Sequence, residues 1–143
     1  MNMKDERQFV GYSKYRSRLV DGHVHTELCP HGSGDRTALM IEKAIELRIE
    51  KVCLTEHAPL PAGFAAEYGG DKKAYNTASL KLNQVDSYLE LGRQLQRAYG
   101  THIDISLGFE VDYIPGFETD IQEFLDRYGP LTDDNILSVH FME

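Results

Sequence analysis

The chain has 143 residues, of which 41% are hydrophobic and 27% are charged, a composition that fits one globular domain with a single core. Its formal net charge of −8 argues against general binding to nucleic acid or to anionic membranes. No apolar run approaches the roughly 18 residues of a membrane-spanning helix, and the first twenty residues lack the apolar core of a signal peptide. Two cysteines, Cys29 and Cys53, favour a reducing compartment over a disulfide scaffold, so we predict a cytoplasmic protein.

Hydrophobic periodicity predicts four strands that alternate with three helices. Residues 1–18 form a polar lead-in, and the domain is expected over 19–143. The predicted strands are 19–25, 51–55 running into Glu56-His57, 103–112 and 135–141. The predicted helices are one from a cap at Asp35 or Thr37 to about Leu47, one over 79–99 after a long loop at 58–77, and one over 117–128. This order is typical of parallel strands joined by helical crossovers.

Two histidines spaced i, i+2 end the first predicted strand, within Asp21-Gly22-His23-Val24-His25-Thr26. Alternate side chains share one face of a strand, so His23 and His25 are expected to project together, about 6–7 Å apart along the chain. This spacing suits two imidazoles that bind one metal ion, and Asp21, at the same parity, is placed to orient a ligand from behind. The alternative is a strand end with two solvated histidines, because His-x-His alone is a weak signal.

Each predicted strand has one apolar parity and one mixed or polar parity, and the polar residues gather at the C-terminal strand ends. Together with the first loop, these ends supply six candidate metal ligands: His23, His25, His31, His57, Glu110 and His140. The apolar parity is expected to pack beneath the helices while the other lines a common interior, as in a (β/α) barrel with its active site at this end. An open doubly wound sheet also binds ligands at this edge, but it does not require histidines on every strand, so we predict a barrel.

Imidazole and carboxylate groups on rigid strands suit Zn, Fe or Mn, and the sequence does not choose among the three. Three or fewer histidines and a carboxylate leave coordination positions open, which is typical of a catalytic site. A bridging Glu110 would hold two ions about 3.5–4 Å apart, a spacing used for phosphoester hydrolysis. Cys29 lies near the histidines and is an alternative soft ligand, but without a CxxC partner we interpret it as a free thiol.

Four motifs spread over the chain resemble those of the polymerase-and-histidinol-phosphatase (PHP) superfamily of metal-dependent phosphoesterases. They are Asp21-Gly-His-Val-His-Thr26, Leu54-Thr-Glu-His57, Gly108-Phe-Glu110 and Ser138-Val-His140. The segments Thr55-Glu-His-Ala-Pro59 and Gly108-Phe-Glu-Val-Asp-Tyr113 are most similar in sequence to the histidinol-phosphatase branch. Members of that branch remove phosphate from L-histidinol phosphate in histidine biosynthesis. The resemblance implies a distorted (β/α)7 TIM-like barrel, up to three divalent metal ions at its C-terminal strand ends, and a small phosphorylated substrate.

Residue by residue, the resemblance implies that His23, His25 and Glu110 bind the first metal. Glu110 would bridge to the second metal, which His140 also binds. The ligands implied for the third metal are His31 and His57. Glu56 stands where many relatives have aspartate, and its opposite parity indicates a place behind the ligands, or a structural role, rather than ligation.

The family pattern continues beyond these motifs, with another histidine for the second metal and an Asp-x-His pair for the first and third. Four strands cannot close a barrel that usually needs about 250 residues, so the sequence resembles the N-terminal half of a phosphatase, with the C-terminal half absent. A half barrel exposes the edge of its fourth strand, which favours self-association.

We therefore expect a hydrolase in which metal-activated hydroxide attacks the phosphorus of a phosphomonoester, with no nucleophilic serine or cysteine required. One alternative is a relative that acts on another phosphoester, including a nuclease, although the acidic charge and the lack of a basic stripe disfavour nucleic acid. The other alternative is a metal-binding or assembly fragment without turnover.

Overall fold

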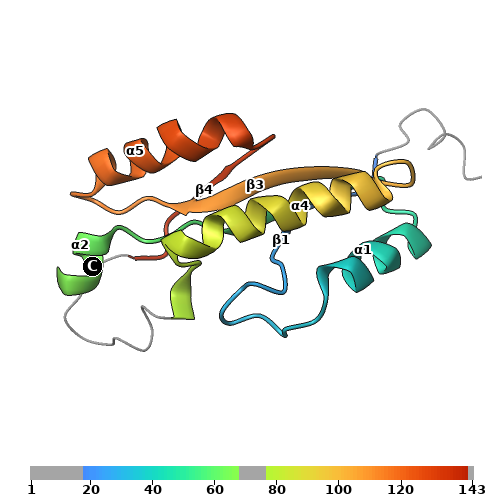
Figure 1. The fold of residues 1–143 in the computed structure, drawn as a ribbon, viewed down its shortest axis with the longest axis horizontal. Coiled ribbons are helices and arrows are strands. Elements are labelled where there is room, and N and C mark those ends of the chain that lie inside the picture. The colour runs from blue at the N-terminus through green and yellow to red at the C-terminus, as the bar shows by residue number, and fades with distance from the viewer. Residues whose placement is uncertain (1–17, 68–76, 142–143) are drawn as a thin grey trace, which may run out of the picture.

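The computed structural model describes residues 18–67 and 77–141 of the chain. Its strands are β1 (Val20–Val24), β2 (Lys51–His57), β3 (Asp104–Asp112) and β4 (Ile136–Ser138). All neighbouring strands are parallel, and they form one sheet in the order β1-β2-β3-β4 (Figure 1). The helices are α1 (Thr37–Glu46), α2 (Ala62–Glu67), α4 (Val85–Tyr99) and α5 (Glu118–Tyr128), with short 3₁₀ turns η1 (Leu82–Gln84) and η2 (Gly129–Leu131).

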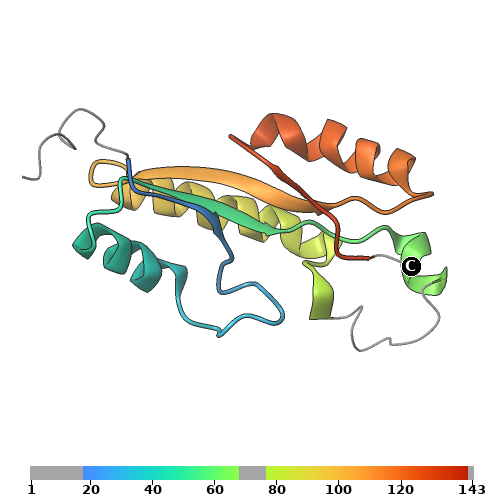
Figure 2. The ribbon, with the colours of Figure 1, turned by 180° about the vertical axis from the view of Figure 1, so that it is seen from behind.

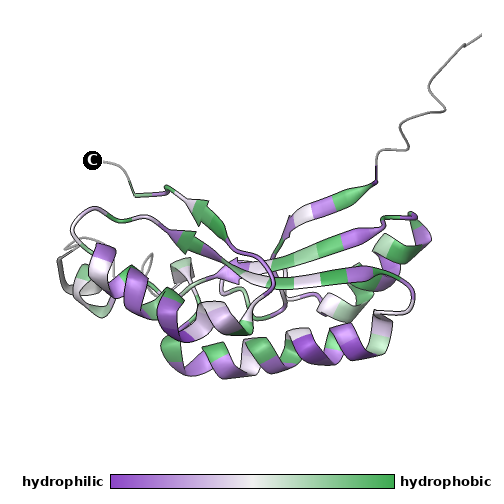
Figure 3. Ribbon diagram, turned by 90° about the horizontal axis from the view of Figure 1, so that it is seen from above, coloured by the Kyte–Doolittle hydropathy of each residue, from purple (hydrophilic) through white to green (hydrophobic). Residues whose placement is uncertain are grey.

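The long helices lie on one side of the sheet, and the opposite face of the sheet is open (Figure 2 and Figure 3). A doubly wound sheet reverses its strand order and carries helices on both faces, so this arrangement excludes that alternative. Parallel strands in chain order with helices on the outside form the wall of a (β/α) barrel. The predicted four parallel strands with crossover helices are confirmed.

The apolar parity of β2 and β3 packs beneath α4, as predicted. Leu54, Leu107 and Phe109 are at most 1% exposed and belong to one cluster with residues of α4. Burying a side chain of this size contributes about 1.5–3 kcal/mol. Tyr88 of α4 packs on Phe109 with ring centres 5.2 Å apart, and its hydroxyl donates to the Gly108 carbonyl oxygen 2.6 Å away. The core of the domain therefore lies between the sheet and its helices.

The two edge strands depart from the predicted burial. Leu137 and Val139 are 67% and 54% exposed, and Val20 is 50% exposed, so the prediction that these residues pack beneath helices is wrong. For Leu137 and Val139 the physical reason is their position, because β4 is a sheet edge and no described helix follows it. Val20 is paired with Lys51, one residue before the core residue Val52, so its side chain faces the open side of the sheet. β4 also ends at Ser138, so His140 follows the strand instead of lying within it. Self-association through such an edge stays a prediction.

The start of α1 differs from the predicted cap at Asp35 or Thr37. The capping position is Arg36, and its side chain makes no capping bond. Glu27 takes over this role, because its Oε2 accepts the Thr37 N–H at 2.7 Å, and the Thr37 hydroxyl oxygen accepts the Glu27 N–H at 3.1 Å. The reciprocal pair ties the loop after β1 to the helix.

Other helix and loop boundaries differ from the predicted ones. The helix predicted from Ser79 begins with η1 and continues as α4 from Val85, and α2 lies inside the predicted loop 58–77. Of the predicted segments, the lead-in up to residue 17 and positions 68–76 of that loop lie outside the described residues. In the described part of the chain, no helix combines the length and apolar character needed to cross a membrane.

A short segment after η2 caps the edge of β3 before β4 begins. The backbone N–H groups of Leu107 and Phe109 donate to side-chain oxygens of residues 133–135, at 2.9 Å in both cases. The backbone crosses so close to the strand that a Cβ on Gly108 would overlap the Asp134 carbonyl oxygen. Only glycine permits this approach.

Replacing Gly108 with alanine should therefore destabilise the domain. Overpacking costs about 1–3 kcal/mol, and because the obstacle is backbone we expect the upper end, a fall in Tm of about 10 °C in thermal unfolding of the 143-residue chain. Gly129→Ala is the matched control, because a Cβ there meets nothing within 4 Å and φ is −54°. Equal Tm values for the two variants would contradict the close approach.

Candidate metal centre

The sheet register brings candidate residues of neighbouring strands side by side. His57, at the end of β2, is paired with Glu110 of β3, and Asp112 of β3 is paired with Ser138 of β4. Paired residues of parallel strands point to the same face, so these four side chains all enter the open face of the sheet. The candidate centre is thus positioned first by backbone pairing.

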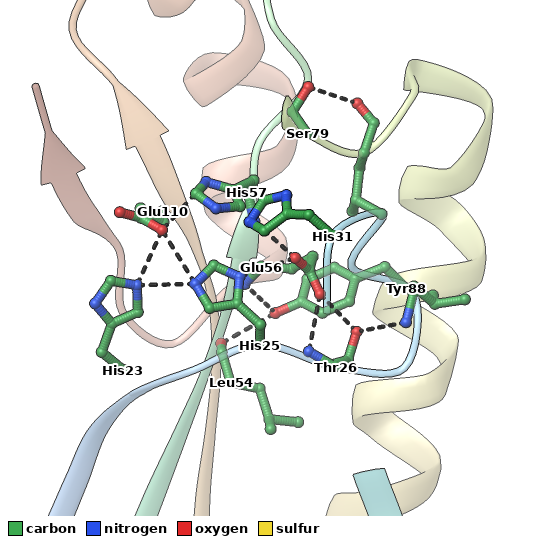
Figure 4. A network of polar contacts seen from close by, with 12 residues as sticks. His23, His25, Thr26, His31, Leu54, Glu56, His57, Ser79, Tyr88 and Glu110 are labelled. Atoms are coloured by element: carbon green, nitrogen blue, oxygen red, sulfur yellow. Dashed lines mark hydrogen bonds and ion pairs between the residues drawn. The ribbon is translucent and has the colours of Figure 1, made fainter. Parts of the chain in front are cut away.

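His23 of β1 and His25, just after it, are positioned by an irregularity in that strand. Between Asp21 and Val24, three residue steps of β1 match two of β2. Such a bulge re-aims side chains, and His23 and His25 both point toward Glu110 (Figure 4). Asp21 is paired with the core residue Val52, on the helix side of the sheet. This register does not support the predicted place of Asp21 behind the histidines.

Glu110 is the residue on which the other predicted ligands converge (Figure 4). Its side chain is 3% exposed. Oε2 lies 2.9 Å from His23 Nε2, 3.2 Å from His25 Nε2 and 3.2 Å from His57 Nδ1. Oε1 lies 3.4 Å from His140 Nε2. Four predicted ligands, all histidines, therefore surround the predicted ligand Glu110.

The donor atoms fit a bound divalent ion. Ligands held 2.0–2.2 Å from one ion lie about 2.8–3.6 Å from each other, which covers the nitrogen–oxygen distances around Glu110. His57 Nδ1 is buried and forms no hydrogen bond with the described residues, because its 3.2 Å approach to Glu110 lacks hydrogen-bond geometry. Burial also lowers the pKa of His57 to about 4, so the ring is neutral at pH 7, as a metal ligand must be.

Glu56 lies behind His25 and is fully buried. Its Oε1 accepts hydrogen bonds from His25 Nδ1 at 3.0 Å and from the His57 N–H at 3.1 Å. Its Oε2 accepts two from Thr26, at 2.9 Å from the N–H and 2.7 Å from the hydroxyl. Burial disfavours ionisation, but the bonds from His25 and Thr26 outweigh it and lower the pKa of Glu56. Glu56 is therefore a charged group that contacts ligands without facing Glu110.

Three sets of described side chains each place three ligand atoms within 4.8 Å of one another. They are His23, His25 and Glu110; His57, Asp112 and His140; and His25, Cys29 and Glu56. The first is the set predicted for the first metal. The second contains Asp112, which the sequence analysis did not single out. The available signal was its position two residues after Glu110 on the same strand, hence on the same face.

His31 lies at the margin of this cluster. Its ring centre is 5.0 Å from that of His57 and 6.3 Å from that of His25. Its Nδ1 donates to the Thr77 carbonyl oxygen at 2.7 Å, so Nε2 is the nitrogen available for other partners. None of the three sets within the described ranges includes His31. Its role with His57 at a third metal stays a prediction.

Cys29 is a buried free thiol beside His25 and Glu56. Burial raises the pKa of the Cys29 thiol, so the thiol form is favoured. The role of Cys29 as a free thiol stays a prediction.

The cluster is buried at its base and open at its rim. The side chains of His23 and His140 are 46% and 48% exposed, in contrast to Glu110. A cavity of about 550 Å³ lies between the segment after β2 and α5, and its lining includes Asp112 but none of the predicted ligands. A solute would therefore reach the cluster from the open face of the sheet.

Comparison with known proteins agrees with this geometry. The family model of the PHP domain matches residues 21–143, which include every residue of the cluster. The chain belongs to the PHP domain family. This PHP domain is 41% identical over 122 residues to the histidinol-phosphatase of Bacillus subtilis, a match that covers 85% of the chain and 44% of that protein. It therefore spans less than half the length of that relative.

Two solved structures share the fold. A candidate histidinol phosphatase from Listeria monocytogenes is 44% identical with a TM-score of 0.84, over 87% of this chain and 46% of that one. This match confirms the predicted partial TIM-like barrel. The histidinol phosphate phosphatase of Lactococcus lactis, solved with zinc, L-histidinol and phosphate, is 24% identical with a TM-score of 0.66, over 87% of this chain and 41% of that one. At that identity it supports the fold alone.

Metal binding should stabilise the PHP domain through Glu110. A ligand present at a hundred times its Kd stabilises the folded state by about 2.7 kcal/mol, so Zn²⁺ or Mn²⁺ should raise the Tm of the 143-residue chain by several degrees and a chelator should reverse the rise. Glu110→Gln keeps the shape but removes the charge, and should abolish most of the rise and lower the bound-metal content. Glu46→Gln is the control on an exposed carboxylate. A full rise in Glu110→Gln would refute the site.

Proposed function

We propose that this PHP domain is part of a divalent-metal-dependent phosphomonoesterase that hydrolyses L-histidinol phosphate. The observation that carries the proposal is the convergence of four imidazoles on the buried carboxylate of Glu110. Identity of 41% with the Bacillus histidinol-phosphatase supports the substrate. Because the domain spans less than half of that relative, the activity is proposed for a protein that also supplies the remaining part of the barrel.

The charge of the cluster explains why metal ions are needed. Glu56, Glu110 and Asp112 are buried within it. Among the described residues, the polar contacts of the cluster involve no lysine or arginine. A phosphate group would be repelled by three carboxylates unless cations neutralise them. Divalent ions would neutralise this charge, polarise the phosphoryl oxygens and lower the pKa of an attacking water.

We assign the proposed ligands as the family resemblance implies. His23, His25 and Glu110 would hold the first ion, and Glu110 and His140 would hold the second. The residues proposed for a third ion are His31 and His57. Zn, Fe and Mn all suit these ligands, so the identity of the metal and the number of ions, up to three, are left to measurement.

The chain itself positions Glu110 for this role. The Ser138 hydroxyl donates to Oε1 at 2.5 Å, and the register places Glu110 beside His57. The opposite oxygen faces the histidines of β1. The exposed rim at His23 and His140 leaves space through which a small phosphorylated substrate can approach.

We further propose that the protein acts in the cytoplasm on small molecules. Cys29 and Cys53 are both free, which suits a reducing compartment. The net charge of −8 opposes nucleic acid as a substrate, so a nuclease is disfavoured.

The deciding experiment is an assay of phosphate release from L-histidinol phosphate. We would compare the metal-loaded 143-residue chain, alone and with the separately produced C-terminal half of the Bacillus relative, in the presence and absence of chelator. Metal-dependent release that prefers L-histidinol phosphate over nucleotides supports the proposal. Metal binding without release in either sample would favour the alternative of a binding fragment without turnover.

His57→Ala should lower the number of bound ions by about one, because the cluster loses a proposed ligand whose buried Nδ1 has no hydrogen-bond partner among the described residues. We expect kcat to fall about 10²-fold or more in any active sample. His102→Ala is the control, because His102 is exposed at the other end of β3 and its side chain bonds only to Thr101 among the described residues. Unchanged metal content and kcat in His57→Ala would assign His57 a structural role.

A further inference from the structure

Two buried carboxylates stand behind two histidines of the cluster in the same way. His25 Nδ1 is 3.0 Å from Glu56 Oε1, and His140 Nδ1 is 2.7 Å from Asp112 Oδ1. The carboxylate side chains are 0% and 6% exposed. In both rings the other nitrogen, Nε2, faces Glu110, at 3.2 Å and 3.4 Å. Each histidine therefore lies between an outer carboxylate and the central one.

An outer carboxylate fixes which nitrogen of the ring carries the hydrogen. An ionised carboxylate only accepts hydrogen bonds, and a neutral imidazole has a single N–H. With Nδ1 donating to the carboxylate, the lone pair lies on Nε2 and points at Glu110. Carboxylates placed in this way orient metal-binding imidazoles and raise their basicity.

The remaining histidines show that the pattern is specific to particular rings. His57 presents Nδ1, not Nε2, to Glu110, and that nitrogen has no hydrogen-bond partner among the described residues. His31 donates Nδ1 to the Thr77 carbonyl, a neutral acceptor. Only His25 and His140, of the rings in the described ranges, have a carboxylate at Nδ1 and Glu110 at Nε2.

We propose that Glu56 and Asp112 are positioning residues that hold His25 and His140 as Nε2 ligands, whereas His57 binds through Nδ1. The inference rests on the proposed metal centre but adds the ligand atom of three rings and the residues that set it in two of them. Glu56 has a second task, because it also accepts bonds from Thr26 of the loop after β1 and from the His57 backbone of β2. The Asp112 carboxylate, in contrast, bonds to one residue among its described hydrogen bonds, His140, through the ring and the backbone N–H.

That difference determines the experiment. Glu56→Gln can fail to fold, so Asp112→Asn is the primary variant and Glu56→Gln the second, both in the 143-residue chain. Asp133→Asn is the control, because Asp133 also accepts bonds through its carboxylate, from the Leu107 N–H and from Gln96, but lies outside the cluster. Ring ¹⁵N chemical shifts at alkaline pH, where imidazoles are neutral, report the tautomer, and chelator competition reports zinc affinity.

In the parent chain we expect Nδ1–H in His25 and His140. In Asp112→Asn we expect a mixture of tautomers at His140, because an amide can donate as well as accept, and a 10–100-fold loss of zinc affinity. Asp133→Asn should lower Tm and leave the tautomers and the zinc affinity unchanged.

Two results would overturn the inference: Nε2–H in both rings of the parent, or zinc affinity within threefold of the parent in folded Asp112→Asn. A parent chain that binds no zinc but shows Nδ1–H in both rings would refute the metal centre and still support the positioning role. The two proposals can therefore fail separately.

Discussion

The buried carboxylate of Glu110 is the constraint on which the rest of the structure depends. An isolated ion buried in a protein costs several kcal/mol, so Glu110 must be surrounded by groups that offset its charge. Glu110 lies on β3, and its surroundings come from the other three strands or the segments just after them: two histidines from β1, one from β2, and Ser138 and His140 from β4. The irregularity in β1 and the register of β2 against β3 both serve this convergence.

The two faces of the sheet differ in role: one packs the hydrophobic core and the other carries the candidate metal centre. On the helix side, β2 and β3 bury apolar side chains against α4. On the open side, the same strands carry Glu110 and His57. Tyr88 connects the two, because its hydroxyl accepts the Glu56 N–H at 3.3 Å and donates to the Gly108 carbonyl. Tyr88, a core residue of α4, thus bonds to the backbone of Glu56, whose carboxylate bonds to His25.

Three acidic side chains within one histidine cluster support the proposal of more than one bound cation. Glu110 occupies the centre, while Glu56 and Asp112 stand behind His25 and His140. A single divalent ion would leave this group of carboxylates with net negative charge. Several ions would balance it and add the positive field that a phosphate group requires. Bound cations would thus allow this acidic domain to bind the anionic substrate that we propose.

The sequence by itself determined the strand order, the apolar parity of β2 and β3, and five of the residues that meet at the centre. The alternation of apolar and polar side chains along a strand, and the motifs at the strand ends, can be read directly from the residues. The sequence did not predict the bulge that turns Asp21 away, the exposure of Leu137, or the bond between Asp112 and His140. These depend on register, on which strands lie at the edge, and on distances between segments far apart in the chain. Only the tertiary structure decided which nitrogen of each ring faces Glu110, because a ring's orientation is set by the groups packed behind it.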